Sequence, residues 1–139
     1  FWTGITRLSW EILRDQNLRY LENVISLNKI KNQAIELKRL FEEKKISISK
    51  IGNLINEGWI TKKTLSKNIS SKFFDNVFSK AIQDGAYGGR MCGAGGGGFV
   101  LFFANPNCHK KLIKNMQKFD LKKFDLSFGN KGTEILVNL

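Results

Sequence analysis

Residues 85–103 read GAYGGRMCGAGGGGFVLFF, the most informative stretch of this 139-residue chain. Eight of the chain's 13 glycines lie between Gly85 and Gly98, and an apolar run at residues 99–103 follows directly. That run has the length and the aromatic and β-branched content of a buried strand. A glycine loop leading into such a strand, without the serines of a flexible linker, indicates positive φ angles or the close approach of a backbone or ligand.

Two common phosphate-binding patterns do not explain this loop. Residues 93–98 formally satisfy G-x-G-x-x-G, but that dinucleotide pattern must follow a strand and open a helix, whereas here it leads into a strand. A Walker A loop ends in Gly-Lys-Ser/Thr, whereas Gly98 is followed by Phe99. The loop therefore belongs to another class of glycine motif.

Residues 85–98 resemble the C-terminal glycine motif of the GHMP kinases, the family of galacto-, homoserine, mevalonate and phosphomevalonate kinases. That motif reads roughly G-A-x-G-x-K-x-x-G-A-G-G-G-G before an apolar strand, and this chain departs from it with Arg90 in place of the lysine. The segments TGITR at residues 3–7 and GWITKKTLS at residues 58–66 are similar to the D-glycero-D-manno-heptose 7-phosphate kinase branch. Fucose-type sugar kinases share a similar Trp-x-x-Lys segment, so the glycine motif is more specific than the heptose assignment.

The resemblance implies an α+β fold, a ferredoxin-like sandwich in which an antiparallel sheet has helices packed on one face. Residues 1–139 are expected to form a single domain, the C-terminal lobe of a GHMP kinase, with the N-terminal ATP-binding lobe absent from this chain. The length and the 42% hydrophobic content suit one domain with a core. The chain opens on Phe-Trp-Thr-Gly without an initiator methionine, which we interpret as the end of a strand in a fragment of a longer protein.

The implied activity is that of an ATP-dependent sugar kinase, with a heptose phosphate (D-glycero-D-manno-heptose 7-phosphate) as substrate. ATP and Mg²⁺ are the implied cofactors of the full-length enzyme, and the missing lobe and a sugar phosphate are the implied partners. In this family the phosphate loop and the catalytic aspartate lie in the N-terminal lobe, and no matching segment occurs here. This chain alone is therefore expected to contribute no catalytic residue and no metal ligand, to bind neither cofactor and to be inactive. The aspartates are interpreted as cap, turn or surface residues: Asp15, Asp75, Asp84, Asp120 and Asp125.

The predicted site combines the glycine loop with four polar residues. The loop consists of Gly93, Ala94, Gly95, Gly96, Gly97 and Gly98. Its N–H groups could form an anion-binding nest near the transferring phosphates, or the loop could pack against the phosphate loop of the absent lobe; both uses require glycine. Valine at Gly95 or Gly96 is expected to lower turnover more than stability, and a variant that melts early but stays active would show that the loop serves packing alone. The predicted substrate-binding residues are Thr3, Arg7, Lys62 and Arg90.

The sequence also allows other interpretations of these residues and of the whole chain. Arg90 could instead face solvent, and Trp59, three residues before Lys62, could simply belong to the core. The net charge of +11, from 23 basic and 12 acidic residues, admits a free-standing basic ferredoxin-like binding module for RNA or a small acidic effector. Because the lysines are scattered and no RNP-type aromatic pattern occurs, no nucleic-acid partner is expected.

Nothing in the sequence predicts a membrane partner. No apolar stretch approaches the roughly 18 residues of a membrane span, and no signal peptide is visible. Cys92 and Cys108 lack the spacing of metal ligands and need not pair. A reduced, cytoplasmic setting is therefore expected.

Hydrophobic periodicity predicts helices at residues 9–43, 49–57 and 71–84. A break is expected near residues 28–32, and Gly58 and Gly85 are interpreted as helix ends. Residues 59–70 are expected to be irregular or briefly helical, and Asn105-Pro106 to begin another helix. The predicted strands cover residues 1–3, 86–92, 99–104, 124–128 and 133–139, the last two forming a hairpin around the turn at 129–132.

Overall fold

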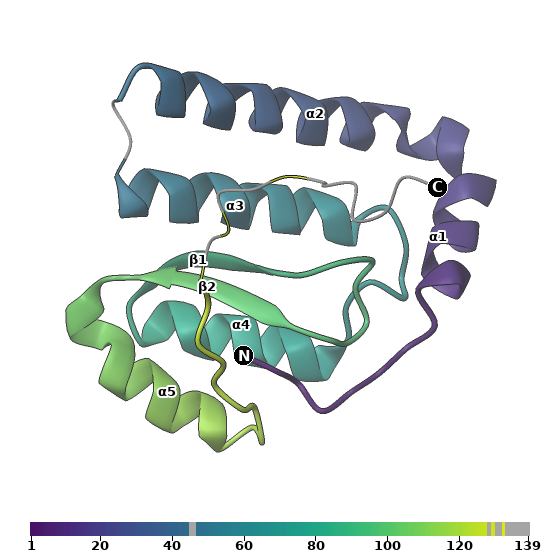
Figure 1. The fold of residues 1–139 in the computed structure, drawn as a ribbon. Coiled ribbons are helices and arrows are strands. Elements are labelled where there is room, and N and C mark those ends of the chain that lie inside the picture. Colours follow the sequence, from purple (N-terminus) through teal and green to yellow (C-terminus); the bar gives the residue numbers. More distant parts are fainter. Residues whose placement is uncertain (45–46, 128, 130–131, 133–139) are drawn as a thin grey trace, which may run out of the picture.

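The computed structural model describes residues 1–44, 47–127, 129 and 132. Its elements follow one another along the chain as shown in Figure 1. They are α1 (Ser9–Leu18), α2 (Tyr20–Glu42), α3 (Ile48–Lys63), α4 (Lys72–Gln83), β1 (Ala86–Met91), β2 (Val100–Ala104), the 3₁₀ turn η1 (Pro106–Cys108) and α5 (His109–Gln117). No helix within the described residues is long and apolar enough to cross a membrane.

The sheet is built on an antiparallel pair, β1 and β2, in which Met91 lies opposite Val100. Trp2 extends this sheet by forming antiparallel bridges to Phe99 on one side and to Lys122 on the other. The N–H of Trp2 donates to the carbonyl of Lys122 at 2.7 Å, and the N–H of Lys122 donates back at 2.9 Å. The described sheet has two strands, and the two bridges place Trp2 and Lys122 beside β2 in the order β1, β2, Trp2, Lys122, which is the order of a ferredoxin-like sheet. The predicted α+β fold class is confirmed.

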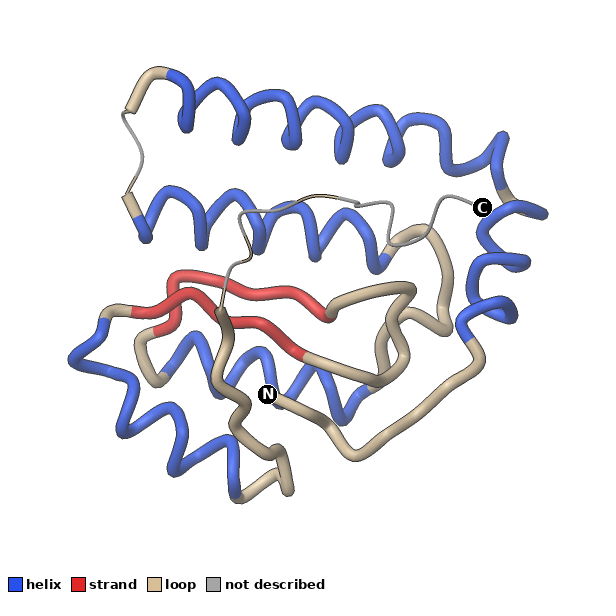
Figure 2. The backbone as a smooth tube through the Cα atoms, viewed as in Figure 1, coloured by secondary structure: helices blue, strands red, loops and turns tan. Residues whose placement is uncertain are grey.

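Helices cover both faces of the strands, which lie between α3 and α4 in Figure 2. The ring of Phe102 meets Phe78 of α4 edge-on at 5.2 Å, whereas the next residue, Phe103, lies against Gly52 of α3. Because consecutive strand residues point to opposite faces, α3 and α4 lie on opposite sides of the sheet. The prediction that the helices pack on one face of the sheet was therefore wrong: α4 and α5 cover one face, and α3 with α2 covers the other.

A close contact between backbones sets the position of α3. A Cβ added to Gly88 of β1 would lie 2.1 Å from the carbonyl oxygen of Gly52, and one added to Gly52 would lie 2.6 Å from the Cβ of Tyr87. A glycine inside a helix costs about 1 kcal/mol relative to alanine, so Gly52 weakens α3 locally. In return, its small size lets α3 lie directly on the backbone of β1.

The core lies mainly on the α4 face. Trp59, from the last turns of α3, reaches this core and stacks on Phe78 of α4, with ring centroids 5.0 Å apart and an interplanar angle of 21°. This confirms the core interpretation of Trp59. This cluster continues beneath the glycine loop through the buried side chains of Ile69 and Met91. A second cluster, between α4, α5 and the strands, consists of Val77, Ala81, Ala86, Ala104, Leu112, Met116 and Leu121.

The predicted helix over residues 9–43 is two helices, and the break was predicted in the wrong place. It lies at Arg19, where φ is −101° and ψ is 20°, while residues 28–32 are continuously helical. Leu27 and Ile30 of α2 pack against the core cluster that contains Ile12 of α1. The turn at Arg19 lets both helices reach that cluster, which a single straight helix would not do.

The prediction that Gly58 ends the helix expected at residues 49–57 was also wrong. Helix α3 continues to Lys63, because Trp59 and Thr61 are buried in its last turns. A Cβ at Gly58 would lie 3.4 Å from Oε1 of Gln33, so this glycine faces α2. By contrast, Gly85 ends α4 as predicted, with φ of +101°.

The C-terminal part of the prediction is confirmed only in its first half. Asn105 begins the next helical segment, its side chain accepting a hydrogen bond from the N–H of Asn107 at 2.9 Å, and Pro106 follows it. Residues 124–127 form no strand; the strand contact in this region is the bridge at Lys122. The remainder of the predicted hairpin, residues 128 and 133–139, lies outside the described residues.

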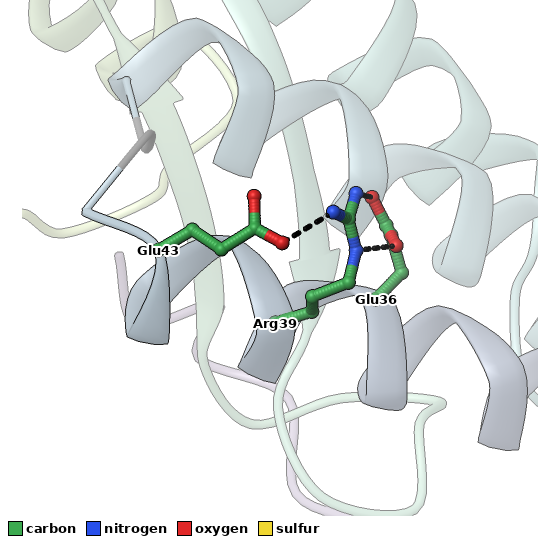
Figure 3. Close-up of polar contacts among 3 residues, drawn as sticks. All are labelled: Glu36, Arg39 and Glu43. Atoms are coloured by element: carbon green, nitrogen blue, oxygen red, sulfur yellow. Dashed lines mark hydrogen bonds and ion pairs between the residues drawn. The ribbon is translucent and has the colours of Figure 1, made fainter.

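The C-terminal end of α2 carries an exposed ion-pair cluster (Figure 3). Arg39 donates to both carboxylate oxygens of Glu36, at 2.8 and 2.9 Å, and to Glu43 at 2.6 Å. The hydrogen bonds from Arg39 lower the pKa of Glu36, burial opposes them, and the charge of Arg39 adds to the lowering. Exposed pairs of this kind contribute little to stability, but they occupy the carboxylate of Glu36.

A buried carboxylate joins α4 to α5. The side chain of Asp84 is fully buried at the end of α4, where Lys80 and Lys111 approach Oδ1 at 3.0 and 3.3 Å. Asn115 of α5 donates to Oδ2 at 2.7 Å. Burial raises the pKa of Asp84, but the hydrogen bonds from Lys80, Asn115 and Lys111 together lower it by more, so the net pKa lies below the ordinary value.

We therefore expect Asp84 to stabilise the protein at neutral pH and not in acid. A carboxyl whose pKa is lower in the folded state contributes stability above its unfolded pKa of about 3.9, and loses it as the pH falls through the folded pKa. Asp84→Asn should lower the free energy of unfolding by about 1–3 kcal/mol at pH 7, and the difference should shrink towards pH 2. Urea unfolding at several pH values measures this. Asp125→Asn, at an exposed position, is the control, and equal stability of the two variants at pH 7 would contradict the prediction.

Candidate functional site

The glycine loop, residues 92–98, connects β1 to β2 and is held tightly by other parts of the chain. Gly95 and Gly96 have φ of +113° and +73°, which side chains with a Cβ rarely adopt. A Cβ on Gly95 would lie 2.8 Å from the carbonyl oxygen of Ile69, and one on Gly96 would lie 3.0 Å from that of Asn68. The loop therefore packs against the segment that follows α3.

The loop's N–H groups divide into two sets. The second half of the loop uses its N–H groups inside the protein: Gly96 donates to the carbonyl of Ile69 at 2.9 Å, Gly97 to Sδ of Met91 at 3.2 Å, and Gly98 to the carbonyl of Ile5 at 2.8 Å. In the first half, the N–H groups donate to no described residue; these belong to Gly93, Ala94 and Gly95. An anion-binding nest is therefore open only in the first half of the loop.

Thr3 holds the C-terminal end of this loop. It is buried, and both its N–H and its hydroxyl donate to the carbonyl of Gly98, at 3.0 and 2.8 Å. Its hydroxyl also accepts a hydrogen bond from the N–H of Ile5 at 3.3 Å. Thr3, predicted as a substrate contact, is thus occupied in positioning the loop.

Arg7 is exposed and lies between two cavities that flank the loop. The first, which we call the loop cavity, has a volume of about 270 Å³ and is lined by Trp2, Thr6, Arg7, Ser9, Cys92, Ala94, Gly95, Gly97 and Gly98. The second, of about 290 Å³, includes Arg7, Asn68 and Gly96. The loop cavity combines a guanidinium, two hydroxyls and two residues with unpartnered N–H groups, a set that suits an anion.

Lys62 and Arg90 form a cation pair beside the start of the loop. The Nζ of Lys62, in the last turn of α3, donates to the carbonyl of Gly93. Burial lowers the pKa of Lys62, and the charge of Arg90 lowers it further, with Cys92 opposing. No carboxylate in the described part of the chain pairs with either cation. Two half-buried cations that lack a counter-ion favour the binding of an anion.

The structure thus gathers all four predicted polar residues around the loop, in two groups. Thr3 and Arg7 precede α1 and contact the loop or its cavity, and Lys62 and Arg90 lie at its start. Sequence reasoning missed Thr6 and Ser9, although the similarity at residues 3–7 pointed to this segment. It also missed the contacts of Asn68 and Ile69 with the loop, for which no local pattern exists.

The acidic side chains that the structure describes are separated or already paired. Within the described residues, no three His, Cys, Asp or Glu side chains lie close enough to hold a metal ion. Asp84 is committed to Lys80, Lys111 and Asn115, and Asp75 to Lys63. The chemistry available at the site is therefore that of anion binding by cations, hydroxyls and backbone N–H groups.

Comparisons with known proteins agree with this arrangement. The D-glycero-alpha-D-manno-heptose 7-phosphate kinase of Campylobacter jejuni is 30% identical over 137 residues, which cover 96% of this chain and 40% of that protein. The bifunctional fucokinase/GDP-fucose pyrophosphorylase of Arabidopsis thaliana is 28% identical over 131 residues, covering 90% of this chain and 12% of that protein. The chain thus spans less than half the length of either relative.

A solved structure supports the fold independently. The mevalonate kinase of L. major, in complex with R-mevalonate, superposes with a TM-score of 0.70 at 14% identity, covering 84% of this chain and 36% of that chain. At this identity the similarity shows the fold alone. Residues 33–120 match the family model described as GHMP kinases C terminal. The chain therefore belongs to the GHMP kinase family and carries its C-terminal domain.

Proposed function

We propose that this chain is the substrate-side lobe of an ATP-dependent sugar kinase that phosphorylates D-glycero-D-manno-heptose 7-phosphate. The observation that carries the proposal is the cation pair Lys62–Arg90, which has no counter-ion among the described residues and lies beside the glycine loop. A substrate that already bears a phosphate would supply the missing negative charge. The similarity to the Campylobacter kinase, over nearly the whole chain, supports the same substrate class.

Phosphoryl transfer depends mainly on positioning and on neutralising the charge of the transferring group. In this proposal, Arg7 and the N–H groups of Ala94 and Gly95 meet the transferring phosphoryl group at the loop cavity. Lys62 and Arg90 hold the phosphate that the sugar already carries. The phosphate loop, the catalytic aspartate and the groups that hold Mg²⁺ would come from the N-terminal lobe, because the described part of this chain offers no metal-binding cluster.

The 139-residue chain by itself should neither hydrolyse nor transfer the γ-phosphate of ATP. The groups that activate the sugar hydroxyl and hold Mg²⁺ are assigned to the other lobe, so only anion binding remains. Release of ADP, measured with ATP, Mg²⁺ and the phosphosugar, should stay at the rate without protein. Phosphoryl transfer by the pure chain would show that the catalytic groups have been assigned to the wrong lobe.

Alanine at Gly95 and at Gly93 should affect the full-length enzyme differently. Both residues have positive φ, but a Cβ on Gly93 meets open space, whereas one on Gly95 meets the carbonyl of Ile69. Gly93→Ala should cost about 1–2 kcal/mol of stability from the left-handed backbone alone. Gly95→Ala should cost more and lower the melting temperature further. Equal melting temperatures would contradict the packing of the loop on this chain. That substitution at Gly95 lowers turnover more than stability stays a prediction, which the turnover of the same variant tests.

Arg90→Ala in the full-length enzyme should raise KM for the phosphosugar about ten- to a hundredfold, because a charge-assisted hydrogen bond is lost. KM for ATP should stay nearly unchanged, and Arg90→Lys should be milder. The control is Arg14→Ala, at an exposed position of α1 away from the described cavities. An unchanged phosphosugar KM would favour a solvent-facing Arg90, and a selective ATP defect would place Arg90 at the nucleotide.

A further inference from the structure

A small cavity between α2, α3 and β1 contains the cation pair, and we call it the inter-helix cavity. Its volume is about 120 Å³. One polar residue comes from each element: Gln33 from α2, Lys62 from α3 and Arg90 from β1. The remaining lining residues are small or apolar: Ile30, Ala34, Leu37, Leu54, Ile55 and Gly58.

The amide group of Gln33, a residue of intermediate exposure, is buried without a hydrogen-bond partner among the described residues. Its Nε2 and Oε1 are both inaccessible to solvent, and neither bonds to a described residue. Leaving such a group unsatisfied costs about 1–3 kcal/mol. Gly58 keeps the space beside Oε1 open, since a Cβ there would lie 3.4 Å away. Because Gln33 lines the cavity, a small rotation of its side chain would bring the unsatisfied amide to a polar molecule bound there.

The charges of the cavity are all positive. Lys62 has used one of its three N–H donors, on the carbonyl of Gly93, and two remain. Gln33 also lines a wider groove between α2 and α3, which contains Lys29 and the two carboxylates Glu36 and Glu57. Neither carboxylate lines the inter-helix cavity itself. Glu36 is moreover occupied by Arg39 (Figure 3). The molecule that fits the cavity is therefore an anion.

The size of the cavity limits that anion. A volume of about 120 Å³ has room for several water-sized atoms, which suits a tetrahedral oxyanion. The apolar remainder of the lining lowers the local dielectric constant and strengthens the attraction of both cations for such a group. Phosphate also offers several acceptor oxygens for the donors of Gln33, Lys62 and Arg90.

We propose that the inter-helix cavity binds the phosphate group of the sugar phosphate, and that Gln33 is a specificity-determining residue of this subsite. The assignment to the substrate rests on the proposed function, whereas the affinity for phosphate does not. Lys62 and Arg90 neutralise the phosphate, and Nε2 of Gln33 donates to one of its oxygens. An unphosphorylated sugar leaves the two cations and the amide unsatisfied, which is how a polar site rejects a ligand that lacks the group.

Gln33→Met separates this role from a purely structural one. Methionine has a similar length and removes both unsatisfied atoms, so the melting temperature should stay the same or rise. Binding of inorganic phosphate to the full-length protein, measured by calorimetry at constant ionic strength, should weaken about tenfold. The matched control is Gln16→Met, because Gln16 also has a buried Nε2 without a partner but does not line the cavity.

A second variant tests the role of charge without changing the size of the side chain. Gln33→Glu keeps the size and adds a negative charge that can pair with Lys62 and Arg90. It should abolish phosphate binding through the cavity and raise the melting temperature. Wild-type phosphate affinity in both Gln33 variants, or weaker binding only in parallel with lost stability, would overturn the assignment.

Kinetics with the same variants distinguish the subsite from the proposed function. If the wild-type enzyme phosphorylates the heptose phosphate, Gln33→Met should raise KM for that substrate about tenfold and leave KM for ATP unchanged. An active enzyme with unchanged KM values in Gln33→Met overturns the subsite while the proposed function stands. Phosphate binding that depends on Gln33, in a protein without activity on the heptose phosphate, supports the anion site and overturns the proposed function.

Discussion

The contact between the backbones of Gly52 and Gly88 is the constraint on which the rest of the arrangement depends. With no Cβ on either residue, α3 lies against β1 closely enough that its last turn reaches the start of the glycine loop. That approach brings Lys62 beside Arg90 and leaves the small cavity that α2 closes with Gln33. A side chain at either glycine would move α3 outward and separate the two cations, so the proposed anion site depends on the same contact as the packing of α3.

The glycine loop is rigid because its own chain holds it from three directions. Thr3 and Ile5 bind its C-terminal end, Ile69 binds its middle, and Lys62 binds its beginning. Packing and the provision of free N–H groups, the two uses considered for its glycines, therefore belong to different halves of the loop. The second half is committed to packing, and the first half keeps N–H groups free of described partners. Donors fixed in advance cost no reorganisation when charge develops on a phosphoryl group, which is the property a transfer site requires.

The basic residues of this chain have different surroundings, and these surroundings are more informative than the number of basic residues. Lysines such as Lys63 and Lys80 are paired with aspartates, and many others are exposed to water, where a charge needs no partner. Lys62 and Arg90 are half-buried, close to each other and without a carboxylate among the described residues. The net charge of +11 therefore says little about a ligand, whereas the position of two of these cations says a great deal.

The sequence by itself determined the features that depend on neighbouring residues. The glycine motif and the apolar run predicted the β1–β2 hairpin and its loop, Gly85 marked the end of α4, and Asn105 with Pro106 marked the next helical start. Glycine conformation and helix capping act within a few residues, so their signals are local. The fold class was predicted from the resemblance of the glycine motif to that of the GHMP kinases.

Only the tertiary structure decided the features that depend on distant contacts. Burial of Trp59 extended α3 beyond Gly58, and the common core of Ile12 and Ile30 moved the helix break to Arg19. Gln33 looks like any polar residue of a helix, and its unsatisfied amide exists only because α2 closes over α3 and β1. Burial is a property of the whole packing, because it depends on which surfaces far apart in the chain exclude water together.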